Sequence, residues 1–196
     1  MTDKPRVLVF AGSTRKGSLN RKLAAAAAEA LERQGLAVTL ADLRDYPMPI
    51  YDGDLEASAG MPESAKSFKD LVQAHDALAI ASPEYNGSFA ALLKNAIDWA
   101  SRAEPGESRL AAFAGKKAVI MAASPSQFGG QRGLRHLREL LEMIHVRVLT
   151  GQLMVGNATA AFDVEGRLVR SEDRAALDRL AAELAQALDV GAPAAA

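Results

Sequence analysis

The feature that most constrains the fold is a regular alternation of short apolar runs with longer Ala- and Leu-rich segments. The predicted strands are 6–12, 36–43, 76–83, 116–124 and 145–155, and the predicted helices are 18–35, 88–102, 133–144 and 171–189. Strands that are apolar almost throughout and alternate with helices indicate a parallel sheet covered on both faces. The small number of strands favours a doubly wound three-layer α/β/α sandwich, with a five-stranded parallel sheet, over a barrel of about eight strands.

The composition narrows the class of protein further. A length of 196 residues with 49% hydrophobic residues fits a single domain spanning 1–196. The net charge of -1 argues against a nucleic-acid partner. The chain has no cysteine, which excludes disulfides, thiolate nucleophiles and cysteine-ligated metals. Because we recognise neither a secretory signal nor a run of about 20 apolar residues, we expect a cytoplasmic protein with no membrane partner.

A polar loop, GSTRKGSLN at residues 12–20, connects the first predicted strand to the first predicted helix. A helix N-terminus presents unpaired N–H groups and a partial positive charge, which suit a phosphate. The loop adds further donors in the side chains of Ser13, Thr14, Arg15, Ser18 and Asn20. Ser18 is equally suited to cap the helix, so the pattern predicts either an anion site or a capped helix after a polar turn.

Two better-known phosphate loops do not match this segment. A P-loop requires a lysine after its second glycine, but Ser18 follows Gly17. The dinucleotide fingerprint requires a glycine at the position of Thr14. The sequence therefore disfavours both a nucleoside triphosphatase and a Rossmann dehydrogenase.

Two further loops follow strands that are predicted to end at the same edge of the sheet. In SPEYNGS, residues 82–88, Pro83 stiffens the turn, Gly87 permits close backbone approach and Tyr85 offers an aromatic face. In ASPSQFGGQRG, residues 123–133, glycines leave the backbone open among polar side chains. Each loop alone could be an ordinary polar connection. Three such loops at one edge favour a site for a flat heteroaromatic ligand.

The segments GSTRKGSLNRKLA and SPEYNGSFAALLKNAIDWASR together resemble the NADPH-dependent FMN reductase family, which includes quinone, azo-dye and chromate reductases. The resemblance covers almost the whole chain and implies a flavodoxin-like fold that binds FMN. It implies phosphate contacts from the first loop, contacts to the isoalloxazine ring from the second, and less specific contacts from the third. The residues concerned are Ser13, Arg15, Ser18, Leu19 and Asn20 in the first loop, Pro83, Glu84, Tyr85, Asn86 and Gly87 in the second, and Ser124, Gln127, Gly129 and Gly130 in the third.

The same resemblance implies an NAD(P)H-dependent oxidoreductase. NADPH or NADH, as co-substrate, would reduce the bound FMN, and a quinone, free flavin or another small molecule would then accept the electrons in a ping-pong cycle. The cofactor supplies the redox chemistry, so no catalytic acid, base, nucleophile or metal ligand is expected. The family also implies a homodimer or homotetramer.

Two alternatives remain open at this point. A flavodoxin-like electron carrier would bind FMN without a site for NAD(P)H, although such carriers are usually acidic. A flavin-binding sensor would bind FMN without significant turnover. Reduction of bound FMN by NADPH, and steady-state turnover with acceptors, separate the three classes.

Several other features carry secondary expectations. Residues 42–64 are rich in Pro and Gly and predict a long loop that serves a site or an interface, whereas 162–168 predict a small hairpin. Trp99 lies just off the apolar stripe of its predicted helix, which makes it a candidate for an interface. His75, His136 and His145 lack metal-ligand spacing and are expected at surfaces or element ends.

Three arginines recur at every third position of one predicted helix. Arg132, Arg135 and Arg138 therefore share one face of that helix. A solvated face explains them most simply. The alternative is an anion site for the 2′-phosphate of NADPH or for the carboxylates of a partner, because guanidinium suits both.

Overall fold

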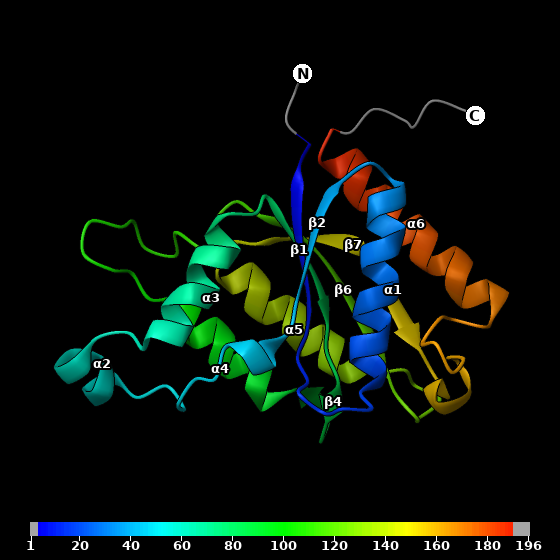
Figure 1. Cartoon of the computed structure of the whole chain (residues 1–196), viewed down its shortest axis with the longest axis horizontal. Helices are drawn as coiled ribbons and strands as arrows, with labels where there is room; N and C mark the ends of the chain where they lie inside the picture. The colour runs from blue at the N-terminus through cyan, green and yellow to red at the C-terminus, as the bar shows by residue number, and fades with distance from the viewer. Residues whose placement is uncertain (1–3, 190–196) are drawn as a thin grey trace.

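The computed structural model describes residues 4–189 and contains a five-stranded parallel sheet in the order β2-β1-β3-β6-β7 (Figure 1). The strands are β1 (Arg6–Ala11), β2 (Ala37–Ala41), β3 (Ala77–Ala81), β6 (Lys117–Ala123) and β7 (Arg147–Val155). Every pairing in this sheet is parallel. The predicted sheet is confirmed, and this strand order is the flavodoxin-like one.

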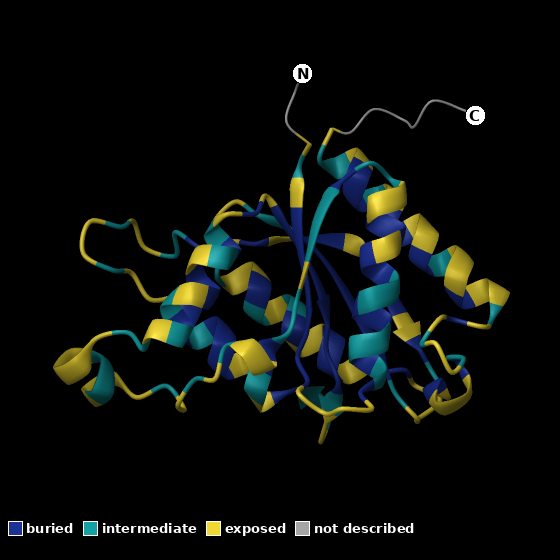
Figure 2. Ribbon diagram, viewed as in Figure 1, coloured by how far each residue is buried: buried dark blue, intermediate teal, exposed yellow. Residues whose placement is uncertain are grey.

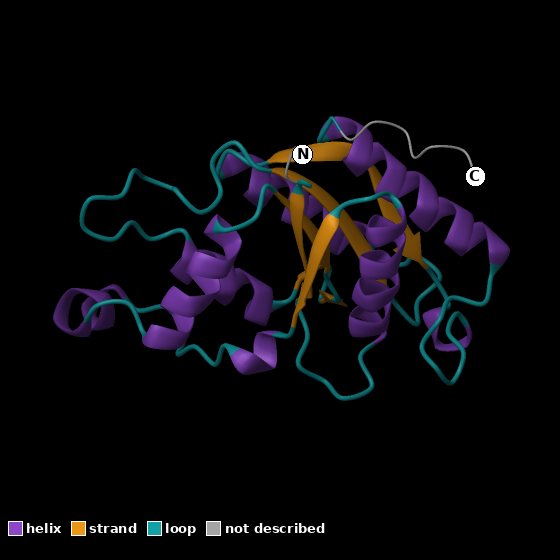
Figure 3. Cartoon of the chain, turned by 45° about the horizontal axis from the view of Figure 1, so that its top comes forward, coloured by secondary structure: helices purple, strands orange, loops and turns teal. Residues whose placement is uncertain are grey.

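Helices cover both faces of the sheet, as Figure 3 shows. One face is covered by α1 (Leu19–Arg33) and α6 (Ser171–Ala187), and the other by α3 (Glu63–Gln73), α4 (Ala91–Ala100) and α5 (Gln131–Met143). The three-layer α/β/α architecture is therefore confirmed.

The strands are apolar throughout because both of their faces are buried. In β1, Val7 and Val9 pack against the cluster of α1 and α6, whereas Leu8 and Phe10 pack against the cluster of α3, α4 and α5. Successive side chains of a strand point to opposite faces, so both sets must be apolar. Figure 2 shows this buried sheet at the centre, between helices that are exposed on their outer sides.

The strand order reverses between β1 and β3. The chain passes from β1 to β2 on one side of β1, and β3 then pairs with the opposite side of β1. Ligands of such sheets bind beyond the carboxyl ends of the strands at this point. The loops after β1, β3 and β6 meet there, as the sequence predicts.

Residues 42–64 contain more regular structure than a long loop. They form the 3₁₀ turn η1 (Leu43–Asp45) and helix α2 (Gly53–Ala59), and they lead into α3, which was not among the predicted helices. The buried positions of α3 include Ala65, Phe68 and Val72, whose helical spacing was the available signal. None of the residues of α2 is buried, and Figure 1 shows this helix projecting at one end of the molecule.

Three smaller expectations have clear outcomes. The predicted hairpin at 162–168 is confirmed by an antiparallel bridge between Phe162 and Leu168. The interface role of Trp99 is wrong, because its side chain is fully buried and Nε1 donates to the Pro49 carbonyl at 2.9 Å. The predicted helix 88–102 begins later, at Ala91, because residues 88–89 form a short strand.

Candidate functional site

The first loop is held at both of its ends. The Gly12 N–H donates to the Ala81 carbonyl at 2.9 Å, which ties the end of β1 to β3. At the other end Ser18 is extended and its Oγ accepts from the Arg21 N–H at 3.3 Å, so Ser18 is the N-cap of α1. The cap does not exclude an anion site at Ser18, because a capped helix still has N–H groups at its start that are free to donate.

The free donors are main-chain groups. Among residues 4–189, the N–H groups of Gly17, Leu19 and Asn20 donate to no other residue. They belong to the turn and first positions of α1, where the helix dipole adds partial positive charge. This cradle matches the needs of a phosphate group.

Asn20 has a structural task that the sequence did not reveal. Its Nδ2 donates to the Ala123 carbonyl and its Oδ1 accepts from the Ala123 N–H, both at 2.9 Å. The side chain is 3% exposed. Asn20 therefore joins the start of α1 to the end of β6, and its predicted phosphate contact now rests on its main-chain N–H.

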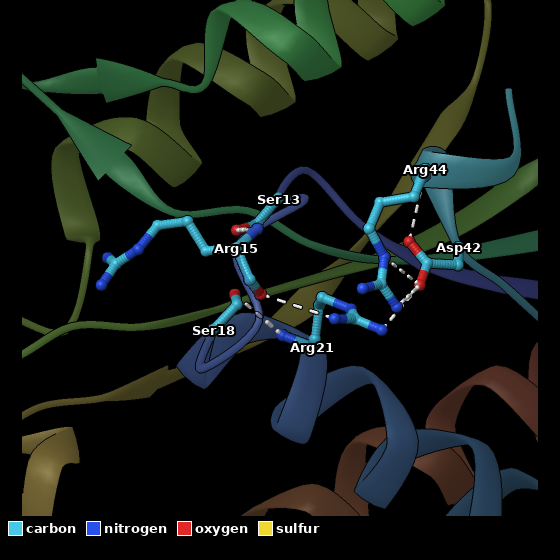
Figure 4. A network of polar contacts seen from close by, with 6 residues as sticks. All are labelled: Ser13, Arg15, Ser18, Arg21, Asp42 and Arg44. Carbon is cyan, nitrogen blue, oxygen red and sulfur yellow. Dashed lines mark hydrogen bonds and ion pairs between the residues drawn. The ribbon is translucent and has the colours of Figure 1, made fainter. Parts of the chain in front are cut away.

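Figure 4 shows how the charges around this loop are distributed. Arg21 and Arg44 both bind Asp42 Oδ2, each at 2.6 Å. Burial raises the pKa of the Asp42 carboxyl, but the hydrogen bonds from Arg44 and the charge of Arg21 outweigh it and hold the pKa below its usual value. The Arg15 side chain points away from this group and makes no ion pair with any residue from 4 to 189. Its guanidinium is thus available to an anion.

The second loop is a tight hairpin. Strands β4 (Glu84–Tyr85) and β5 (Ser88–Phe89) pair across Asn86 and Gly87, whose φ angles are 51° and 78°. Two successive positive φ angles are typical of the Asn-Gly hairpin turn. Glu84 Oε2 accepts from the Gly133 N–H at 2.8 Å, which fixes the hairpin to the start of α5. Tyr85 is left 51% exposed.

Two glycines of the third loop, Gly129 and Gly130, are packed closely against neighbouring parts of the protein. A Cβ at Gly130, where φ is 86°, would lie 2.6 Å from the Cβ of Ala122. A Cβ at Gly129 would lie 2.9 Å from the carbonyl carbon of Met154. A side chain at either position would clash with the protein itself, so packing already requires glycine there, and a contact of their main chain with a ligand stays a prediction.

The three loops surround one cleft of about 310 Å³ at the carboxyl edge of the sheet. It is lined by Ser13, Arg15, Ser18, Leu19, Asn20, Pro83, Glu84, Tyr85 and Ser124, all of them predicted site residues. The remaining predicted residues do not line it: Asn86 and Gly87 form the hairpin tip, and Gln127, Gly129 and Gly130 lie further along the third loop.

The cleft also contains residues that the sequence reasoning missed. They are Gly17, Ala123, Pro125 and Thr159. Thr159 lies in η2 (Ala158–Ala160), after β7, and reaches the cleft because the Ala158 N–H donates to the Ser124 carbonyl at 2.9 Å. Nothing in the local sequence marks Thr159, since its position depends on that contact.

The histidines and the helices add two observations. His75 is 2% exposed at the end of α3, and its ring nitrogens contact the Leu71 carbonyl and Thr39 Oγ1. Within the described part of the chain, no three His, Asp or Glu side chains are grouped to bind a metal ion. No helix there is long and apolar enough to cross a membrane.

Comparison with known proteins decides the family. The sequence model of the NADPH-dependent FMN reductases matches residues 5–160. The chain belongs to this family. The matched range contains all three loops of the cleft, so the resemblance inferred from the loop motifs is confirmed.

Individual members agree with this family and fold. The chain is 42% identical over 177 residues to an NAD(P)H-dependent FMN reductase of Pseudomonas aeruginosa, covering 89% of this chain and 90% of that one. It is 32% identical over 188 residues to a quinone reductase of Escherichia coli, covering 94% of each. The solved structure of the flavoenzyme NAD(P)H:(acceptor) oxidoreductase FerB of Paracoccus denitrificans matches with a TM-score of 0.79 at 28% identity, over 93% of this chain and 96% of that one. These reductases favour the enzyme interpretation over the electron carrier and the sensor.

Proposed function

We propose that the protein is an NAD(P)H-dependent oxidoreductase that binds FMN and reduces quinones, free flavin or similar small-molecule acceptors. The observation that carries this proposal is the cleft, which joins a cradle of free N–H groups to an exposed aromatic hairpin at the switch point of the sheet. Membership in the FMN reductase family supports the same cofactor. The proposal places this site on one flavodoxin-like domain spanning 1–196.

The first loop holds the phosphate of FMN. The N–H groups of Gly17, Leu19 and Asn20 donate to it, and Arg15 supplies the unpaired positive charge. Ser13 and Ser18 lie at the same wall and add hydroxyl donors. The phosphate-binding part of the cleft thus depends on the conformation at the start of α1, which the Ser18 cap fixes.

The second and third loops hold the ring. Pro83, Glu84 and Tyr85 of the second loop and Ser124 of the third line the same cleft as the cradle. Main-chain N–H groups at this edge stabilise negative charge on the reduced ring. FMN, when bound, would supply the redox chemistry that connects NAD(P)H to the acceptor. The protein positions the FMN, supplies positive charge to its phosphate and leaves one face of the ring open beside Tyr85.

We further propose a cytoplasmic homodimer or homotetramer in which residues 42–64 cover part of a neighbouring copy. The support is that α2 buries none of its residues and that Ile50 is 77% exposed, although this segment is firmly attached. Asn95 accepts from the Tyr51 N–H and donates to the Pro49 carbonyl, both at 2.8 Å. A chain without cysteine fits a reducing compartment. Sedimentation velocity tests the assembly, and a monomer at micromolar concentration would contradict it.

The test of function uses the purified full-length protein. We expect it to retain FMN, to lose the oxidised flavin absorbance on anaerobic mixing with NADPH, and to regain it on addition of a quinone. Retention of FMN without bleaching would support the electron carrier instead. Bleaching with negligible steady-state turnover of quinones, ferricyanide and free FMN would support the sensor. Failure to bind FMN would overturn the proposal.

A further inference from the structure

Two of the described residues that line the cleft have charged side chains, and their charges are opposite. Arg15 belongs to the first loop, which carries the cradle of N–H groups, and Glu84 belongs to the second loop. The phosphate of FMN accounts for Arg15. A carboxylate in the wall of a cleft for an anionic cofactor opposes binding, because like charges repel. The phosphate therefore does not account for Glu84.

The carboxylate of Glu84 is held by the start of α5. Its Oε2 accepts from the Gly133 N–H at 2.8 Å, in the first turn of this helix. The N–H groups at a helix start and the helix dipole stabilise a carboxylate in that position. The contact joins the β4–β5 hairpin to a helix that follows the third loop, across a separation of 49 residues in the sequence. It therefore fixes the second loop relative to the third.

The backbone of α5 leaves room for this contact because residue 133 is glycine. A Cβ on Gly133 would lie 3.2 Å from the Cβ of Glu84 and 3.3 Å from its Cγ. Both distances are tighter than an ordinary van der Waals contact, so a side chain at this position would push against the stem of Glu84. The stem thus packs directly on the backbone of α5, which limits how far the carboxylate can move.

The arginines of α5 do not neutralise this carboxylate, because Glu84 forms no ion pair within the described part of the chain. Arg138 instead donates to two carbonyls of β7, at 3.1 and 2.8 Å. Arg135 pairs with Glu139 at 3.3 Å, and Arg132 pairs with no described carboxylate. The negative charge of Glu84 is therefore offset by the main chain of α5 and not by a cation.

We propose that Glu84 is a positioning residue for the ring of FMN and that its charge lowers the reduction potential of the bound cofactor. The contact with α5 holds Pro83, Glu84 and Tyr85 at the wall of the cleft. Reduction adds electrons to the ring, and a carboxylate in the same cleft makes this addition less favourable. The inference rests on the proposed function and deepens it, since a lower potential lets the reduced enzyme reach more weakly oxidising acceptors.

Three variants of the full-length protein separate the contact from the charge. Glu84→Gln keeps an oxygen that accepts from the Gly133 N–H but removes the charge, whereas Glu84→Ala removes both. Gly133→Ala keeps the charge and disturbs the contact, because its methyl group would press on the stem of Glu84. Glu29→Gln is the matched control for the loss of a carboxylate, since Glu29 is exposed on α1 and does not line the cleft.

The reduction potential of the FMN-loaded protein reports the charge. Equilibration with reference dyes should show a higher potential for Glu84→Gln than for wild type. We expect reduced FMN to gain affinity over oxidised FMN by roughly tenfold, which corresponds to about 30 mV for a two-electron couple. Gly133→Ala should shift the potential less than Glu84→Gln does, because the carboxylate is still present. Glu29→Gln should leave it unchanged.

The affinity of the apoprotein for oxidised FMN reports the contact. Fluorescence titration should give a loss of roughly tenfold for Glu84→Ala and for Gly133→Ala, because the hairpin is no longer fixed to α5. Glu84→Gln should stay within about threefold of wild type, since it keeps the hydrogen bond. Circular dichroism of each apoprotein checks that it is folded, and if either of the other two variants does not fold, the potential of Glu84→Gln decides.

An unchanged potential in Glu84→Gln, or an equal rise in Glu29→Gln, would overturn the inference that the charge acts on the ring. Wild-type affinity in a folded Glu84→Ala protein would overturn the positioning role. Failure of the wild-type protein to bind FMN is a different result, because it would overturn the proposed function and the inference with it.

Discussion

At the scale of single residues, the arginines around the first loop are not equivalent. Arg21 and Arg44 share the carboxylate of Asp42, whereas Arg15 has no carboxylate partner among the described residues (Figure 4). A guanidinium that is already paired contributes little further attraction to an anion, because its charge is largely neutralised. The sequence alone could not rank these arginines, since it does not show which of them Asp42 would reach.

This difference gives a prediction for Arg15. Replacing Arg15 with Gln should weaken FMN binding by roughly tenfold, because one charge-assisted contact to the phosphate is lost. The melting temperature of the protein without FMN should stay within about 1 °C, since Arg15 is exposed and unpaired. Fluorescence titration of the apoprotein with FMN measures the first effect. Lys16→Gln is the control, because Lys16 is exposed on the same loop but does not line the cleft. Equal affinities for Arg15→Gln and wild type would remove Arg15 from the phosphate site.

Tyr85 carries a separate prediction. Its ring is 51% exposed at the mouth of the cleft, so Tyr85→Leu should change the ratio of kcat/KM values between a small quinone and free FMN by about threefold or more. The affinity for FMN should change much less, because the phosphate contacts lie on the first loop. Steady-state assays with several acceptors check this. A uniform change across all acceptors would place the ring away from the reaction face.

At the scale of elements, the site depends on contacts that join α1, β6, the β4–β5 hairpin and α5. Asn20 connects the start of α1 to the end of β6, and Glu84 connects the hairpin to α5. Each contact pairs a side chain with main-chain groups of a distant segment. The cleft therefore keeps its shape without relying on the loops alone, and loops that are held in place bind a ligand at a lower entropic cost.

Asn20→Ala tests this connection. The substitution leaves the N–H and carbonyl of Ala123 without their partner in a buried environment, which should lower the free energy of unfolding by about 2 kcal/mol. Urea denaturation of the protein without FMN measures it. Ser13→Ala provides the comparison, because Ser13 is also buried but accepts only the 3.4 Å contact from the Arg15 N–H. Similar stability of the two variants would show that the Asn20 bridge is not a main support of the loop.

At the scale of the whole molecule, one buried lysine connects helix α3 to the long segment between α4 and β6. Lys69 of α3 is 1% exposed on its side chain and pairs with Glu107, and it lies 3.6 Å from Glu104. Both carboxylates belong to the segment between α4 and β6. The hydrogen bond from the Glu104 N–H, followed by those from Lys69 and Gln73, lowers the pKa of Glu107 to about 2.

This lowered pKa predicts how stability depends on pH. The pKa of Glu107 is below its unfolded value of 4.5, so its contribution is present above pH 4.5 and is lost as the pH falls toward 2. Glu107→Gln should therefore lower the free energy of unfolding by about 1 kcal/mol at pH 7, after allowance for solvent screening. The difference from wild type should shrink as the pH falls through this window. Urea denaturation at several pH values measures it, and a difference that is independent of pH would contradict the assignment.

Much of the site was predictable because its signals are local. A polar loop after an apolar strand, followed by an Ala-rich helix, is visible in residues 12–33, and the Asn-Gly pair at 86–87 marks a tight turn. The family resemblance used the same local signals and is confirmed. The roles of individual predicted residues at FMN stay predictions, with the cleft showing which of them lie together.

The rest was not predictable because it depends on distant partners. Trp99 was expected at an interface, but the Pro49 carbonyl and the ring of Tyr51 cover it from a segment about 50 residues away. Asn20 was expected to contact phosphate through its side chain, but both ends of its amide bind Ala123. Thr159 carries no local signal at all and reaches the cleft from beyond β7.

The amino-acid sequence by itself determined the strands, most of the helices and the edge of the sheet where the three polar loops meet, because apolar periodicity and loop chemistry act between neighbours in the chain. Only the tertiary structure decided which polar groups remain unpaired. Asp42 neutralises Arg21 and Arg44 but not Arg15, and the arginines of α5 differ in the same way. Whether a charge is available to a ligand depends on what lies within a few ångströms of it in space, and folding alone sets those distances.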